Sequence, residues 1–288
     1  MKLINHGVLT GTALTVALLA TPTRAAEFEI DSFTVGKNGA TWFVDDFSDG
    51  VAPPSAPSFP GGAAASYSVG GTAGPEAGGL LSLDPAQGVL ATNAAGATRR
   101  TLRAALNSNT NSADLASGLK IDDTLSVRGL FNFSSPTGPL ANGYGVRFTD
   151  RSSAGLFEIA ELLVFYSPTT GTARIGWVNQ DFAASATSLV ESAELELMKG
   201  VDQILLRIDR PDRTSPDFFA SWDYLSGGVK VGGGSFLTPI ALFDGESFVR
   251  AEIMAYTAVP AAVPLPGTLW LIGAGLLAGL GFARRRQA

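Results

Sequence analysis

The sequence predicts a mainly β protein, in which an antiparallel β-sandwich occupies residues 27–258 between an N-terminal signal peptide and a C-terminal transmembrane helix. Three observations favour this class. Short segments alternate apolar and polar residues, which is the period of a strand with one buried face. Glycine-rich turns separate these segments, and evidence for helix is thin. A chain of this kind buries its apolar faces by packing one sheet on another.

The strand prediction rests on alternating segments of the central region. These are residues 27–35, 125–133, 144–148, 204–208 and 247–256. Turn signals lie between them, at Asp49-Gly50, Pro136–Gly138, Asn142-Gly143, Pro168–Gly171 and Ser226–Gly228. Residues 51–79 are rich in proline, glycine and alanine and predict a long irregular loop. A helix competes with a strand only over residues 183–198.

Residues 203–228 carry the most detailed strand pattern. Ile204, Leu206 and Ile208 share one face, residues 210–216 form a turn, and an aromatic strand follows that ends in an Asp-containing turn. This pair of strands resembles those of concanavalin A-like, laminin-G-type jelly rolls, and residues 45–50 and 143–148 fit the same fold loosely. The resemblance implies a jelly-roll sandwich and leaves the activity open.

The N-terminal 26 residues have the layout of a secretory signal peptide. Lys2 supplies a positive start, residues 8–20 are apolar, and Thr23–Ala26 offer small residues for cleavage. We therefore expect export, with the mature chain beginning near Ala26 or Glu27. The alternative is an N-terminal anchor that stays attached.

The C-terminal segment, residues 259–288, predicts a membrane anchor. Residues 268–283 contain neither a charge nor a proline and would form a helix of about 24 Å, which residues 263–267 extend toward spanning length. Arg284, Arg285 and Arg286 follow directly and are expected to stay on the cytoplasmic side of the inner membrane. A transmembrane helix over about 267–283 is therefore expected; the alternative is a buried core helix.

The tail also carries a short proline motif, Val263, Pro264, Leu265 and Pro266, ahead of the apolar run and the arginine cluster. In this order the three parts resemble the VPLPA-type variant of the PEP-CTERM sorting signals. Gly267 stands where that variant commonly has alanine. The resemblance implies recognition by an exosortase that cleaves near the proline motif. It also implies a Gram-negative host that makes extracellular polysaccharide.

Charge limits the partners of the exported part. Of the 20 basic residues, five lie in the two terminal segments, whereas all 26 acidic residues lie between them, so the exported part carries a net charge of about −11. An acidic surface argues against binding nucleic acid or anionic polymers through charge alone. The acidic charge is compatible with neutral glycans or cations as ligands.

The central region has no cysteine and no histidine, because the only histidine, His6, lies in the predicted signal peptide. This excludes Ser-His-Asp and Cys-His catalysis and the usual zinc sites. No cofactor is expected, with calcium as the one candidate. Asp45, Asp46 and Asp49 place hard oxygen ligands close together at a predicted strand end, which suits calcium.

Glu158 and Glu161 are the carboxylates that invite a glycosidase hypothesis. Such enzymes need two carboxylates that flank one bond. On a strand, an offset of three places the two side chains on opposite faces, so we expect no enzyme here. The alternative is a secreted polysaccharide-active enzyme that depends on carboxylates.

Trp177, Trp222 and Tyr224 are candidates for stacking on sugar rings; the alternative for each is a place in the core. Together, the patterns favour an exported surface or extracellular-matrix protein, associated with exopolysaccharide or biofilm and sorted by an exosortase. Its sandwich is expected to bind extracellular polysaccharide or matrix proteins, or to act structurally, without catalysis.

Overall fold

The computed structural model describes residues 27–53, 55–60, 62, 64–107, 118–150, 158–195, 200–242 and 248–259. Over these ranges the chain forms antiparallel strands and one short 3-10 helix, Pro85–Gln87. None of the helical structure in these ranges has the length and apolar character needed to cross a membrane. The predicted signal peptide (1–26) and the predicted transmembrane helix (267–283) lie outside the described residues.

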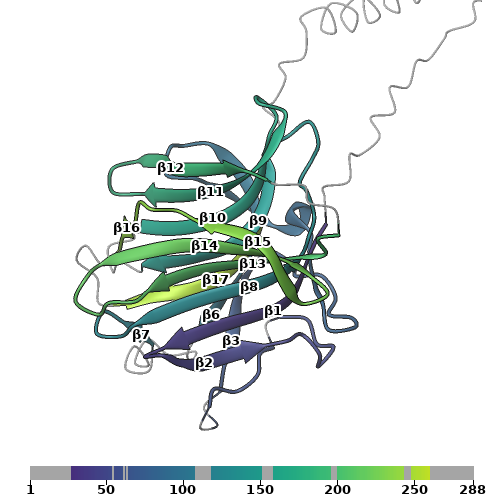
Figure 1. The fold of residues 1–288 in the computed structure, drawn as a ribbon. Coiled ribbons are helices and arrows are strands. Elements are labelled where there is room, and N and C mark those ends of the chain that lie inside the picture. The colour runs from purple at the N-terminus through teal and green to yellow at the C-terminus, as the bar shows by residue number, and fades with distance from the viewer. Residues whose placement is uncertain are drawn as a thin grey trace, which may run out of the picture.

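The first sheet, sheet A, has the strand order β15-β14-β13-β8-β1-β2 (Figure 1). Two short strands extend it, since β4 pairs with β1 and β16 pairs with β14. Its strands are β1 (Phe28–Lys37), β2 (Ala40–Asp45), β4 (Leu81–Leu83), β8 (Leu125–Asn132), β13 (Gln203–Arg210), β14 (Asp217–Ser226), β15 (Val229–Ser235) and β16 (Ile240–Ala241).

The second sheet, sheet B, has the order β12-β11-β10-β9-β17-β6-β3, with β5 paired to β6 and β7 paired to β17. Its strands are β3 (Ser66–Gly70), β5 (Val89–Thr92), β6 (Thr98–Asn107), β7 (Leu119–Lys120), β9 (Asn142–Asp150), β10 (Glu158–Ser167), β11 (Thr172–Asp181), β12 (Ala186–Glu194) and β17 (Phe248–Ala258).

One hydrophobic core lies between the two sheets. Alternation along each strand directs every second side chain inward. Sheet A contributes Val127 and Leu206, and sheet B contributes Val146 and Leu162, to a single buried cluster. The two sheets therefore pack face to face, as Figure 1 shows. This confirms the mainly β, antiparallel prediction.

Sheet B also curves over its own outer face. Four strands, β17, β9, β10 and β11, separate β6 from β12 in the sheet. Nevertheless, the amide of Ala95, in the turn between β5 and β6, donates a hydrogen bond of 3.2 Å to the Thr187 hydroxyl on β12. The β5–β6 hairpin therefore reaches across the outer face and shields the middle of sheet B from solvent.

Most of the predicted elements agree with the structure. The five alternating segments fall in β1, β8, β9, β13 and β17, and the stretch 183–198, where helix competed, contains the strand β12. The prediction of an irregular loop over residues 51–79 was wrong for β3. In that strand Tyr67 points into the core and its hydroxyl donates to Asp45, which fixes the segment against sheet A.

Candidate functional site

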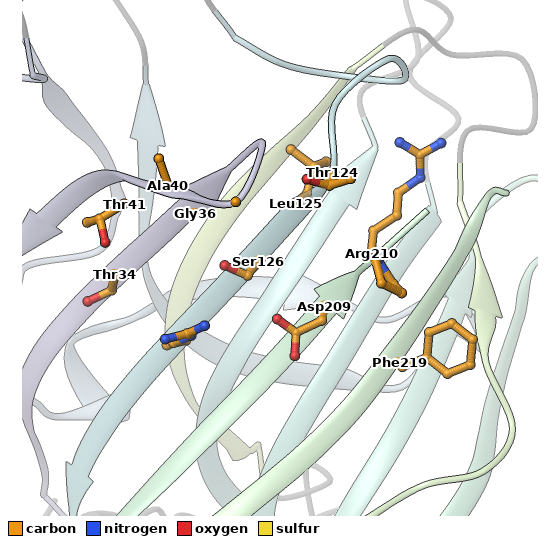
Figure 2. A pocket seen from close by; sticks show the side chains of 13 residues that line it. Thr34, Gly36, Ala40, Thr41, Thr124, Leu125, Ser126, Asp209, Arg210 and Phe219 are labelled. Carbon is orange, nitrogen blue, oxygen red and sulfur yellow. The ribbon is translucent and has the colours of Figure 1, made fainter. Parts of the chain in front are cut away.

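A groove of about 570 Å³ lies on the outer face of sheet A. Figure 2 shows the side chains that line it, which come from neighbouring strands. One cross-strand row forms its middle, because the pairing register places directly adjacent residues of five strands side by side. From β2 to β14 this row consists of Thr41, Gly36, Ser126, Asp209 and Phe219.

The alternation of the strands explains why these side chains lie outside the core. In β8, Leu125 and Val127 point inward, so Ser126 and Arg128 point outward. Gly36 leaves room for the Ser126 side chain in the middle of the row, because a Cβ at position 36 would clash with the Ser126 hydroxyl. The row therefore presents hydroxyl groups beside a carboxylate, with little side-chain bulk between them.

The groove combines an exposed aromatic ring with hydrogen-bonding groups. Phe219 is 38% exposed at one end and offers an aromatic face, and sugar rings stack on such faces through their C–H groups. Arg128 and the hydroxyls of Ser126 and Thr34 supply hydrogen-bonding groups along the rest of the groove. Burial raises the pKa of Asp209, although the neighbouring Arg207 and Arg128 favour its charged form.

The three aromatic residues predicted to stack on glycans are in the core instead. Trp177 is 0% exposed, and its indole Nε1 donates to the Thr238 carbonyl at 3.0 Å. Trp222 is 8% exposed and packs against Phe236, and Tyr224 is 1% exposed. Each occupies an inward position of its strand, so none of them is accessible to a sugar. The prediction for these three residues is corrected to a role in packing.

The carboxylates predicted to bind calcium support their own turn. Asp45 accepts hydrogen bonds from the Phe47 amide and the Tyr67 hydroxyl, Asp46 accepts from Ser48, and Asp49 accepts from the Val51 amide. In the ranges that the structure describes, no three acidic, histidine or cysteine side chains are arranged to hold a metal ion. In this arrangement the three carboxylates bind groups of the protein rather than converge on one point. Calcium binding at Asp45, Asp46 and Asp49 therefore stays a prediction without geometric support.

Glu76 joins this acidic corner from the segment before β4. Its carboxyl group is buried and shares a hydrogen bond with Asp49. Burial, the hydrogen bond and the charges of Asp49 and Asp45 together raise the pKa of Glu76 to about 8. With this pKa, the carboxyl group of Glu76 is mostly protonated at neutral pH.

Comparison with known proteins identifies one segment of the chain. Residues 262–287 match the family model of the PEP-CTERM protein-sorting motif. This motif implies processing by an exosortase, and it implies export through a membrane-anchored precursor in Gram-negative bacteria. No curated protein and no solved structure matches the chain, so the jelly-roll resemblance stays a prediction.

The predicted sorting residues, Val263–Pro266 and Arg284–Arg286, lie inside the matched segment and outside the described residues. The groove residues were not predicted as a site. Ser126, Arg128 and Asp209 occupy polar positions of β8 and β13, two strands that the sequence predicted. The alternation of these strands therefore already indicated that the three side chains face outward. Phe219 follows Phe218 directly, and only one of two consecutive strand residues can face the core.

Proposed function

We propose that the chain is an exported protein of the cell surface or extracellular matrix whose sandwich binds polysaccharide without cleaving it. In this proposal residues 1–26 are removed as a signal peptide. Residues 267–283 hold the precursor in the inner membrane with Arg284–Arg286 on the cytoplasmic side, and an exosortase then cleaves near Val263–Pro266. The sorting motif supports the route, and the groove on sheet A supports the binding.

The observation that carries the binding is the row from Thr41 to Phe219. It combines one exposed aromatic ring with hydroxyl and charged groups across five strands. Protein sites for sugars use this combination, since the ring covers the apolar face of the sugar and the polar groups bind its hydroxyls.

Two features support a role without catalysis. Among the described residues that line the groove, Asp209 is the only carboxylate, whereas glycoside hydrolysis uses two. Glu161, one of the carboxylates weighed for an enzyme, is 0% exposed and bound by two arginines. Burial alone would raise the pKa of Glu161, but the charges of Arg99 and Arg147 lower it, so this group is a poor proton donor at neutral pH.

Binding by the groove is tested with neutral oligosaccharides from the host's own polysaccharide, using the full-length protein in detergent micelles. We expect Phe219→Ala to weaken binding about tenfold in calorimetry, because the stacking surface is lost. Leu237→Ala is the matched control, since Leu237 is an exposed apolar residue that does not line the groove. Equal affinities for both variants would refute the assignment of the groove.

The sorting route has its own test. With Pro264→Ala and Pro266→Ala together, we expect the full-length chain to remain in the inner membrane. Mass spectrometry of the membrane fraction measures this. Recovery of a chain that lacks the tail would show that the proline motif does not direct cleavage.

A further inference from the structure

The outer face of sheet B, on the opposite side of the sandwich from the groove, contains a second hollow. Two cavities of about 270 and about 300 Å³ lie on this face. Arg99 on β6 and Gln180 on β11 line both cavities, so they are two ends of one depression. We call it the sheet B furrow. The β5–β6 hairpin, which reaches β12 through Ala95, shields it from bulk solvent.

Arg147 lines one end of the furrow, Glu161 lines the other, and Glu252 lies beside Arg147 outside the lining. The register places Glu252, Arg147 and Glu161 directly beside one another on β17, β9 and β10. The Arg147 guanidinium donates to Glu161 Oε1 at 2.9 Å and to Glu252 Oε2 at 2.6 Å. Arg99 also donates to Glu161 Oε1, at 3.0 Å. These hydrogen bonds hold the charged side chains in one arrangement before any ligand arrives.

Several buried polar atoms in this region have no partner among the described residues. Gln180 is 1% exposed, and neither its amide nitrogen nor its amide oxygen makes a hydrogen bond. Glu161 Oε2, on the same face, is also without a partner. Nearly all buried polar groups in proteins are hydrogen-bonded, so unsatisfied groups in a cavity wall are expected to bind water or a ligand that displaces it. Gln180 offers both a donor and an acceptor to both ends of the furrow.

The two ends of the furrow differ in charge. Arg99, Arg103 and Arg147 line the larger end, and no acidic residue is among its described lining residues. Glu161 and Glu252 balance two of these arginines. Arg103 has no carboxylate partner in the described part of the chain and supplies one excess positive charge. This is a local exception in an exported region with a net charge of about −11.

The smaller end is mainly apolar. Leu163, Val178, Leu189 and Phe165 line it, together with the Tyr256 ring. The Phe165 ring lies over Gly176, where a Cβ would come 2.6 Å from its Cε1 atom. At roughly 30 Å³ for each water, either end holds about ten water molecules, which is comparable with one sugar ring.

We infer that the sheet B furrow binds a carboxylated sugar, that is, a uronic acid unit of an acidic polysaccharide. Arg103 and Arg99 bind the carboxylate, Gln180 binds a hydroxyl as both donor and acceptor, and the apolar end covers the face of the neighbouring ring. The furrow is separate from the groove on sheet A. The choice of a sugar over another carboxylate rests on the extracellular role proposed above.

The test uses calorimetry on the full-length protein in detergent micelles. The probe is a galacturonic acid trisaccharide, compared with the galactose trisaccharide that lacks its carboxylates. We expect the charged probe to bind at least tenfold more tightly than the neutral one, and added salt to weaken it. We expect Arg103→Gln to weaken the charged probe about tenfold. Arg213→Gln, on an exposed turn outside the furrow, is the matched control and should bind as the unmodified protein does.

A second variant separates binding from folding. Gln180→Leu removes a buried amide that has no partner, so its melting temperature should not fall, while its affinity for the charged probe should fall. The inference is overturned if the charged probe does not bind, or if Arg103→Gln and Arg213→Gln bind it equally. It is also overturned if a triglutamate peptide binds as tightly as the uronide. Loss of uronide binding in Phe219→Ala would place the ligand in the groove on sheet A, and so would overturn it too.

Discussion

The two outer faces of the sandwich follow the same strand alternation and yet have different chemistry. On sheet A, the outward side chains of the groove form an open row, and the ion pair nearby between Arg207 and Asp223, at 3.7 Å, is partly exposed. On sheet B, the outward side chains Arg147, Glu161 and Glu252 are buried and joined at 2.6–2.9 Å. The difference arises from the β5–β6 hairpin, which reaches β12 and shields one face only. Alternation decides which side chains face outward. Whether those side chains form exposed or buried ion pairs depends on what covers the sheet.

The largest expected effect tests this difference directly. Arg147→Ala leaves Glu252 buried without its cation and removes one of the two arginines at Glu161. We expect the free energy of unfolding to fall by about 3–5 kcal/mol, because an uncompensated charge stays buried. Urea denaturation monitored by circular dichroism measures it. A loss below about 1 kcal/mol would mean that Glu252 and Glu161 find other partners, such as water, once Arg147 is removed.

A smaller effect is expected where the two sheets meet. The Tyr67 hydroxyl on β3 donates to Asp45 at the end of β2, at 2.9 Å, and so links sheet B to sheet A. Tyr67→Phe should lower the free energy of unfolding by about 1–3 kcal/mol, because Asp45 Oδ2 loses its buried donor. Tyr166→Phe, at a half-buried position on β10, is the control and should change stability little.

The acidic corner next to this link predicts a dependence on pH. The raised pKa of Glu76 means that a proton stabilises the folded state. This contribution is complete below the ordinary pKa of 4.5 and is lost as the pH rises to about 8. Glu76→Gln should therefore raise the melting temperature at pH 8 by a few degrees, corresponding to about 1 kcal/mol, and have little effect at pH 4. Thermal unfolding of both proteins at pH 4 and pH 8 measures this difference. An equal shift in melting temperature at the two pH values would contradict the raised pKa of Glu76.

The smallest effect belongs to the open face. Arg207→Ala removes the partly exposed pair with Asp223, and we expect a change below about 1 kcal/mol that 1 M salt abolishes. The same urea titration applies, so Arg207→Ala is also the matched control for Arg147→Ala. Similar losses for the two arginines would remove the distinction between the faces.

The sequence predicted the parts of the fold that depend on local patterns. β1, β8, β13 and β17 were found because each has an apolar period of two over several residues. β3 was missed because it is short and lies among proline, glycine and alanine, so its only strong signal is Tyr67. Its place in sheet B comes from pairing with β6, more than 30 residues later in the chain.

The candidate sites were harder to predict, because they depend on contacts between distant residues. Glu161 was considered for catalysis on its spacing from Glu158 alone. Its actual partners, Arg99 and Arg147, lie 62 and 14 residues away, and no local pattern connects them. The tryptophans were misplaced for a related reason, since a large aromatic residue on a strand suits both a core and a binding surface. The sorting motif, whose signal is contiguous, was identified from sequence, and a family model matches it over residues 262–287.

The position of β17 has a mechanical consequence. This strand lies in the interior of sheet B, bonded along its length to β9 and β6, and it leads directly into the segment that carries the sorting motif. A pull on the chain from its C-terminal side would therefore reach β17 before any other strand. The ladders on both of its sides must then shear together, whereas an edge strand would peel away one bond at a time. β17 would therefore resist such a pull more strongly than β12 or β3, which lie at the edges of the same sheet.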